Sequence, residues 1–254
     1  MTPVCMTTFG DEYWQRYGRE SVTTWLDKWP GKIVAYGEGA APRDLPKQVE
    51  YRDLYAVEGM KDFLRWTSMV PLLQGIMPNG EYSYHFNAHK FARKVFAISE
   101  MKEPFFFIGA DVHMTKPIPA EFLNRMLDGK FGAFLFRGAA HTESDFAGYN
   151  TAHPEWEKFI VLWKSLYVNG GFLALTETEN RKLAGFHECW TLDWLLRVLN
   201  LKSQCLDITN GAIGDDVNGM HVWPKTVLAE YMVHLKGRIK KDPEKKAEAL
   251  RGAA

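Results

Sequence analysis

The chain alternates between short runs of apolar residues and longer segments in which apolar residues recur at helical spacing. Apolar runs bounded by Gly or Pro are typical of buried strands, and the periodic segments are typical of amphipathic helices. Strands are predicted at 3–9, 32–39, 50–57, 131–138 and 203–208. A further short strand is predicted to begin at residue 104, and another to form the later part of 141–150. Helices are predicted at 11–30, 58–73, 83–101, 120–129, 154–171 and 186–200. This alternation favours an α/β fold with a mainly parallel sheet.

Ligands of parallel sheets gather at the C-terminal ends of strands, which directs attention to Gly10, Glu38 and Asp111. Asp111 follows an intensely apolar run, FFFIGAD, and His113 lies two residues further on. In an extended backbone both side chains project to one side, where a carboxylate and an imidazole are plausible ligands for a divalent metal. An acid that merely ends a strand before a turn is the alternative interpretation.

A second candidate stretch, HLKGRIK, lies near the C-terminus. It contains His234 as a potential metal ligand, Gly237 as a position that permits close backbone approach, and Lys240 as a cation suited to phosphate. A metal held between Asp111 and His234 would neutralise a diphosphate, and Lys240 would add to this effect. The alternative is the end of an amphipathic helix followed by solvated lysines.

The charge and composition of the chain limit the classes of partner that it can bind. The 254 residues carry 31 Lys and Arg against 31 Asp and Glu, so the formal net charge is zero. Proteins that bind polyanions usually carry a basic excess, so any positive patch here must be local. The sequence is 46% hydrophobic, which is enough for a sizeable core, and it is rich in Trp, Tyr and Phe. These rings are explained either by core packing or by stacking on a flat ligand.

The cysteines Cys5, Cys189 and Cys205 are odd in number and none are close together, which argues for a reducing compartment and against a disulfide scaffold. The N-terminal segment lacks the features of a secretory signal. No apolar run approaches the roughly 20 residues that span a bilayer. We therefore expect no membrane association and a cytoplasmic protein, in the host cytoplasm if a phage encodes it. The oligomeric state is left open.

Five motifs in order give the chain a family resemblance. FFFIGADVHMTKPIP matches the layout of the D-x-D strand of GT-A fold glycosyltransferases, and HLKGRIK matches their late H-x-x-G-x-x-K. AHKFARKVFAI, TESDFAGYN and FHECW resemble segments of a loose group of bacterial and phage glycosyltransferase-like proteins. The resemblance covers roughly residues 4–241. It implies a single GT-A-type domain at 1–241, with a Rossmann-like nucleotide-binding half and an acceptor half. The charged, Ala-rich residues 242–254 are predicted to form a solvated or frayed tail.

Two positions depart from the family pattern. Gly109 stands where D-x-D has its first aspartate, and Asp145 replaces an expected glycine in TESDF. Three interpretations of Gly109 stay open. In the first, the motif survives only as Asp111. In the second, it has shifted to a D-x-H that uses His113, as in enzymes that transfer N-acetylgalactosamine to polypeptides. In the third, the protein has lost its metal dependence or its activity.

The resemblance implies a metal-assisted transfer of sugar from a nucleoside-diphosphate sugar, first among them a UDP-sugar, to a hydroxyl acceptor. The implied cofactor is Mn²⁺ or Mg²⁺, with Asp111, His113 and His234 as metal ligands. Glu188 is the candidate base, and Glu143 and Asp145 are candidates for contacts to the acceptor or sugar hydroxyls. The predicted donor-binding residues are Thr8, Phe9, Tyr13, Tyr36, Glu38, Lys90, Arg93, Lys94, Gly237 and Lys240.

Each role has a simpler alternative. The aromatic residues would pack in the core, and Glu188 would favour a helix dipole. Lys90, Arg93 and Lys94 share a helix face by their spacing, which is equally a solvated basic face. The acidic segment 214–217 is interpreted as a mobile loop, with a lid or acceptor contact as the alternative.

The same residues allow rival functions. A nucleotidyltransferase would need a glycine-rich basic loop after the first strand, which TTFGDEYW lacks. A non-catalytic protein that binds nucleotide-sugars or nucleic acid through a degenerate site is the main alternative. Phage-type relatives also suggest that the acceptor is a modified DNA base, which the enzyme would have to expose from the duplex. Basic residues would then bind the phosphate backbone of the DNA. The residues that would bind these phosphates are Lys236, Arg238, Lys240 and Lys241. The alternative acceptors are saccharides or small molecules.

Overall fold

The computed structural model describes residues 2–137, 141–178, 185–212, 222–237 and 239–252. Its centre is a seven-stranded sheet of order β10-β8-β9-β6-β1-β2-β3. The parallel pairs are β1 with β2 and β6, β2 with β3, and β8 with β10, whereas β9 runs antiparallel to both β6 and β8. The strands are β1 Val4–Phe9, β2 Ile33–Gly37, β3 Val49–Asp53, β6 Phe105–Ile108, β8 Gly132–Leu135, β9 Glu143–Tyr149 and β10 Cys205–Asp207.

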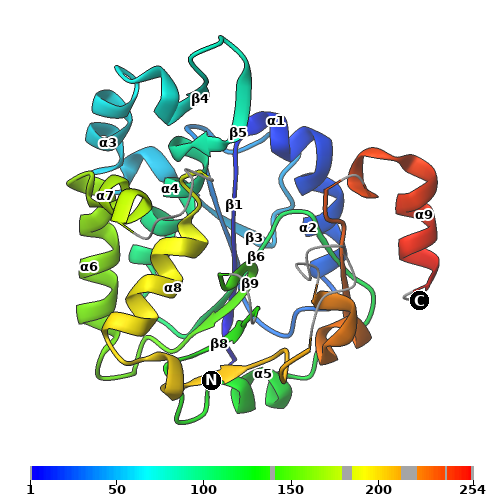
Figure 1. The fold of residues 1–254 in the computed structure, drawn as a ribbon. Helices are drawn as coiled ribbons and strands as arrows, with labels where there is room; N and C mark the ends of the chain where they lie inside the picture. Colours follow the sequence, from blue (N-terminus) through cyan, green and yellow to red (C-terminus); the bar gives the residue numbers. More distant parts are fainter. Residues whose placement is uncertain (1, 138–140, 179–184, 213–221, 238, 253–254) are drawn as a thin grey trace.

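Helices cover both faces of this sheet (Figure 1). One face packs against α3 Met60–Thr67, α4 Ala88–Ser99, α6 Trp156–Val168, α7 Gly171–Thr178 and α8 Glu188–Val198. The other packs against α1 Asp11–Tyr13, the π-helix η1 Trp14–Gly18, α2 Arg19–Trp25 and α5 Ala120–Leu127. Alternation along β1 separates the two cores, since Met6 belongs to the first and Cys5 to the second. The expected α/β architecture with a mainly parallel sheet is therefore confirmed.

Two small antiparallel sheets lie outside the central one. β4 Gln74–Ile76 pairs with β5 Tyr82–Asn87, and β7 Val112–Met114 pairs with β11 Met232–His234. The second pair joins segments more than a hundred residues apart and positions the C-terminal motif. The remaining short helices are η2 Leu54–Ala56, η3 Pro71–Leu73, η4 Lys202–Gln204, η5 Trp223–Lys225, η6 Val227–Glu230 and η7 Ile239–Lys241.

Several predicted boundaries were wrong. The helix expected at 83–101 begins only at Ala88, because the preceding residues form β5 and the Asn87 side chain caps the helix by accepting a hydrogen bond from Lys90 N. The helix expected at 58–73, which Pro71 was expected to end or kink, ends earlier, at Thr67, and Pro71 opens η3. The helical segment 11–30 stops at Trp25. The strand expected at 50–57 ends at Asp53, whose side chain caps η2.

The residues after 242 form a helix, α9 Pro243–Gly252, where a solvated or frayed tail was predicted, and none of the helix residues is buried. Lys246 pairs with Glu20 of α2, so this helix is tied to the domain (Figure 1). Asp242 accepts backbone hydrogen bonds from Glu244 and Lys245 at its start. Among the described residues, every helix is too short or too polar to cross a lipid bilayer.

Candidate functional site

The site begins where β6 ends. The backbone turns at Ala110 and Asp111, so Asp111 leaves the sheet at the C-terminal edge shared by β1, β2 and β6. Because β9 runs in the opposite direction, its first residues Glu143, Ser144 and Asp145 lie at this same edge. The pairing of β11 with β7 then brings His234 beside them. Three separate segments therefore meet at the edge where α/β sheets hold ligands.

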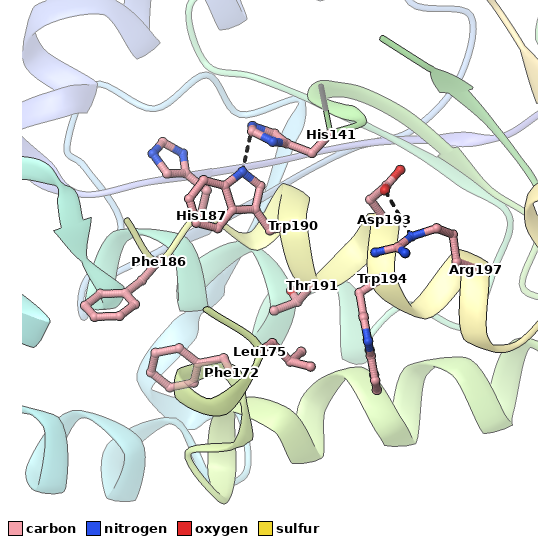
Figure 2. A pocket seen from close by; sticks show the side chains of 10 residues that line it. All are labelled: His141, Phe172, Leu175, Phe186, His187, Trp190, Thr191, Asp193, Trp194 and Arg197. Carbon is pink, nitrogen blue, oxygen red and sulfur yellow. Dashed lines mark hydrogen bonds and ion pairs between the residues drawn. The ribbon is translucent and has the colours of Figure 1, made fainter. Parts of the chain in front are cut away.

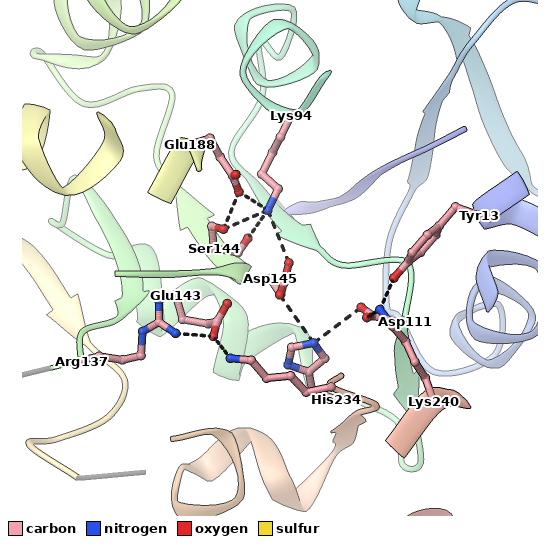
Figure 3. A network of polar contacts seen from close by, with 11 residues as sticks. Tyr13, Lys94, Asp111, Arg137, Glu143, Ser144, Asp145, Glu188, His234 and Lys240 are labelled. Carbon is pink, nitrogen blue, oxygen red and sulfur yellow. Dashed lines mark hydrogen bonds and ion pairs between the residues drawn. The ribbon is translucent and has the colours of Figure 1, made fainter. Parts of the chain in front are cut away.

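The imidazole of His234 lies between two carboxylates (Figure 3). Its Nε2 is 3.6 Å from Oδ1 of Asp111 and 3.5 Å from Oδ2 of Asp145. His234 is 4% exposed and Asp111 is 6% exposed, whereas the Asp145 side chain is 32% exposed. The structure thus brings together the two residues whose proximity the sequence reasoning required. Their role as metal ligands stays a prediction.

Lys240 lies on the outer side of Asp111. Its Nζ donates to Asp111 Oδ2 at 2.6 Å and to the hydroxyl of Tyr13 at 3.0 Å, and it stands over the rings of Tyr13 and Tyr17. Gly237 has φ of 59°, a left-handed conformation that favours glycine, and this turn separates His234 from Lys240. Burial and the charge of Asp111 raise the pKa of Tyr13, so its hydroxyl is protonated at neutral pH.

Lys94 of α4 joins the cluster from the opposite side (Figure 3). Its Nζ lies 2.6 Å from Glu188 Oε1, 3.4 Å from Asp145 Oδ1 and 3.0 Å from the hydroxyl of Ser144. Ser144 in turn donates to Glu188 Oε1 at 2.6 Å. Burial opposes the charge of Lys94, but the carboxylates of Glu188 and Asp145 outweigh it and raise the pKa of the lysine. The predicted base Glu188 is therefore a buried ion-pair partner at the start of α8.

Glu143 anchors the third part of the network. Its Oε2 accepts from Arg137 Nη1 at 3.0 Å and from Lys236 Nζ at 2.6 Å. Burial opposes ionisation of the neighbouring Asp145, yet Lys94, His234 and Lys236 hold the pKa of Asp145 well below its usual range. An acid with so low a pKa accepts a proton poorly at neutral pH. Asp145 is therefore better suited to binding than to acting as a base.

Glu38 and Arg93 form a pair beside Gly10. Arg93 approaches Glu38 Oε1 at 2.6 Å through Nη2 and at 2.8 Å through Nε, and both side chains are about one-fifth exposed. A Cβ at Gly10 would lie 2.9 Å from Glu38 Oε2 and 3.3 Å from Arg93 Nη1, so the glycine lets this pair approach the end of β1. This polar pair sits where the sequence analysis expected the nucleotide.

Three of the predicted donor-binding residues lie in β1 and β2. Phe9 is buried against Trp14 in the second core. Tyr36 is 1% exposed in the first core, and its hydroxyl accepts a hydrogen bond from Arg52. Thr8 is paired with Tyr36 across the strands and is half-buried. Phe9 and Tyr36 therefore pack in the core, which was the simpler alternative for the aromatic residues.

The three basic residues of α4 have different partners. Lys90 is exposed and lies over the rings of Tyr82 and Tyr84 in β5, Arg93 pairs with Glu38, and Lys94 pairs with Glu188. They therefore do not act as one solvated face. Only Arg93 and Lys94 are directed at the edge of the sheet where the acids gather.

His113 does not join the cluster. The prediction assumed an extended backbone from 111 to 113, whereas the chain turns at Asp111. In the β7–β11 pair, His234 lies opposite Val112 and His113 lies opposite Val233, so the two imidazoles occupy different faces. No hydrogen bond or ion pair between described residues joins His113 to Asp111. Burial lowers the pKa of His113, and the charges of Glu20, Lys246 and Asp111 act on it more weakly.

A second polar and aromatic group lies next to the start of α8 (Figure 2). His187 Nε2 is 2.8 Å from His85 Nδ1, and Trp190 Nε1 donates to His141 Nε2 at 2.8 Å. The cavity here is about 30 Å³, near the space of a single water. It is lined by His141, Phe172, Leu175, Phe186, His187, Trp190, Thr191, Asp193, Trp194 and Arg197.

Sequence reasoning missed Arg137, Ser144 and Lys236 as members of the network. Ser144 lies between two residues that were identified, and Lys236 lies within HLKGRIK, so their motifs were a signal for both. Arg137 lies outside every motif, and only its charged side chain after an apolar run distinguishes it in the sequence. The acidic segment 214–217 and Arg238 lie outside the described residues.

The donor types at this site fit a divalent cation. Two carboxylates supply the oxygen ligands that suit Mn²⁺ or Mg²⁺, and an imidazole adds one nitrogen ligand. Among the described residues no three His, Cys, Asp or Glu side chains are already gathered as a metal-binding group. The outer oxygens of the two acids contact Lys240 and Lys94, and the inner oxygens face His234.

No family model and no curated protein matches the sequence. Among solved structures, the galactosyltransferase LgtC, in complex with donor and acceptor sugar analogues, matches 98% of this chain and 93% of its own, with TM-score 0.55 and 11% identity. Mouse xyloside xylosyltransferase 1 matches 81% of this chain and 84% of its own, with TM-score 0.49 and 9% identity. A glycosyltransferase involved in glycosylation of the PBCV-1 major capsid matches 96% and 99%, with TM-score 0.46 and 12% identity.

Proposed function

We propose that the protein transfers a sugar from a nucleoside-diphosphate sugar to a hydroxyl acceptor with the help of a divalent cation. The chain has the GT-A fold, as the sequence motifs predicted. The observation that carries this proposal is the meeting of Asp111, His234 and Lys240 at the C-terminal edge of the parallel strands. LgtC, whose fold this chain shares, was solved with donor and acceptor sugar analogues bound.

The charges at this edge suit the leaving group of such a reaction. When the bond to the sugar breaks, the nucleoside diphosphate accumulates negative charge, and preorganised cations stabilise it. Lys240 supplies one such cation, held in place by Asp111 and Tyr13. Asp111 and His234 would hold the Mn²⁺ or Mg²⁺, which when bound supplies Lewis-acid stabilisation of the diphosphate oxygens.

The nucleoside would lie toward β1 and β2. Gly10 and the Glu38–Arg93 pair stand at the ends of these strands, and Tyr13 lies between them and Lys240. Glu38 has oxygen atoms suited to ribose hydroxyls, and Arg93 has a guanidinium suited to phosphate or carboxylate. A UDP-sugar is the first donor to test.

Proton removal from the acceptor requires a carboxylate if the reaction inverts the sugar. Glu188 is the residue we propose for it, because it lies at the start of α8 and shares Lys94 with Asp145. Glu143 carries two cations on one oxygen and suits a positioning role for hydroxyls.

The acceptor is proposed to be a saccharide or another small hydroxyl compound. Two lysines considered for gripping DNA are directed inward, since Lys236 pairs with Glu143 and Lys240 pairs with Asp111. Held against these carboxylates, the two lysines are not positioned to follow the phosphates of a duplex.

Thermal unfolding of the full chain with UDP and Mn²⁺ tests the proposal. Nucleoside diphosphate with Mn²⁺ should raise the Tm of the protein, and Asp111→Ala and His234→Ala should each abolish this rise. His113→Gln is the matched control, because it removes a nearby buried imidazole on the other face of the β7–β11 pair from His234 and should keep the rise. Each variant is compared with its own Tm in the absence of ligand.

The same measurement extends to UDP-, GDP-, ADP- and CDP-sugars with and without Mn²⁺. A Tm rise that is undiminished in both Asp111→Ala and His234→Ala would refute the metal role of these residues. A protein that ignores all nucleotide-sugars but is stabilised by oligonucleotides would instead be the binding protein of the alternative hypothesis.

A further inference from the structure

We propose that Asp145 supplies the second carboxylate of the cation site and occupies the space left by Gly109, so that an acid of β9 replaces an acid of β6 across the strand pair. The inference rests on the divalent cation of the proposed function. It assigns to Asp145 a binding role that neither its sequence position nor its earlier interpretation as a hydroxyl contact indicated.

The strand register places residues 109 and 145 opposite one another. Ile108 is paired with Phe146 at the end of the β6–β9 ladder, and Gly109 N donates to Asp145 O at 2.8 Å. Opposite residues of an antiparallel pair project to the same face of the sheet. A side chain at either position therefore reaches the same volume in front of His234.

That volume has room for one side chain. A Cβ added at Gly109 would lie 3.3 Å from Asp145 Cβ, 3.4 Å from Asp145 Oδ1 and 3.0 Å from Asp111 Oδ1. Cross-strand Cβ atoms are normally about 4.5–5.5 Å apart, so acids at both positions would be crowded as well as alike in charge. Gly109 and Asp145 are thus complementary, and the absence of a side chain at one permits the other.

The distances around His234 match ligands that share a cation. Its Nε2 is 3.6 Å from Asp111 Oδ1 and 3.5 Å from Asp145 Oδ2, which is longer than a hydrogen bond. Ligands each about 2.1 Å from one ion lie about 3.0–3.6 Å from each other, depending on the angle at the ion. The inner oxygens of both acids therefore stand at ligand spacing from the same imidazole nitrogen.

Mn²⁺ binding to the full chain tests the inference without any assay of transfer. Free Mn²⁺ is measured by electron paramagnetic resonance while the protein is titrated with Mn²⁺ alone. Asp145→Asn and Asp145→Gly should weaken binding by more than about tenfold, because even the loss of a residue that only orients a ligand costs roughly 10- to 100-fold. The double variant G109D/D145G moves the acid back across the pair and should restore binding to within about threefold of the unmodified protein.

The double variant separates a ligand from a structural residue. If Asp145 acted only through its contact with Lys94, an acid at 109 would not restore Mn²⁺ binding. Circular dichroism of each variant confirms that it is folded before the titration is interpreted. Binding unaffected by Asp145→Asn, or a folded double variant that fails to recover binding, would overturn the inference.

The two proposals fail in different ways. If Mn²⁺-dependent binding of UDP is lost in Asp111→Ala but unchanged in Asp145→Asn, the inference is wrong and the proposed function stands. If Mn²⁺ binds in a manner sensitive to Asp145 while no nucleotide-sugar binds, the inference stands and the proposed function is wrong. If the unmodified protein binds no Mn²⁺, the inference is overturned outright.

Discussion

Replacing Lys94 with methionine should destabilise the protein by about 3–5 kcal/mol, because the change leaves the carboxylate of Glu188 buried without its cation. The Lys94 side chain is 11% exposed and that of Glu188 is 4% exposed, with Nζ and Oε1 2.6 Å apart. Screening by solvent is therefore weak for this pair. Ser144 still donates to Glu188 in the variant, which favours the lower end of this range.

A double-mutant cycle isolates the interaction. Glu188→Gln keeps the shape and an acceptor for Ser144, so the double variant K94M/E188Q contains no unpaired carboxylate at this position. We expect the double variant to be less destabilised than Lys94→Met alone, with a coupling free energy between the two substitutions of about 2 kcal/mol.

Urea unfolding followed by far-ultraviolet circular dichroism at pH 7 gives the free energy of unfolding of each variant. A cost below about 1 kcal/mol for Lys94→Met would show that the carboxylate does not depend on this lysine. Additive costs in the double variant would show the same. Either result would remove the physical reason for treating Glu188 and Lys94 as one unit.

Two further changes test the electrostatics and the sheet. Burial lowers the pKa of His187 to about 4 from 6.5, so between these values the unfolded chain binds the proton more tightly. Stability should therefore fall on acidification from pH 6.5 to 4, by up to roughly 3 kcal/mol, and His187→Phe should flatten the profile of urea midpoint against pH. Gly132→Ala places a Cβ 2.4 Å from the backbone oxygen of Gly148, and we expect a loss of about 1–3 kcal/mol in urea unfolding. Gly132 has no positive φ, so backbone strain does not contribute, and a cost near zero would contradict the packing argument.

Local pattern was sufficient for the parts of the fold built from strong, local signals. The apolar run ending in Ile108 had to be a buried strand, and the acid after it had to lie at the edge of the sheet. The α/β architecture followed from the alternation of such runs with periodic segments. Boundaries that depend on capping or on strand pairing were not readable, as the start of α4 after Asn87 shows.

The amino-acid sequence by itself determined which chemical groups the site contains, because acids, an imidazole and a lysine follow strands or lie in recognisable motifs. Only the tertiary structure decided which of them meet. The β7–β11 register selected His234 over His113, and the antiparallel course of β9 placed Asp145 opposite Gly109. Both outcomes depend on pairings between distant segments, and spacing along the chain carries no information about which residues face each other across such a pair.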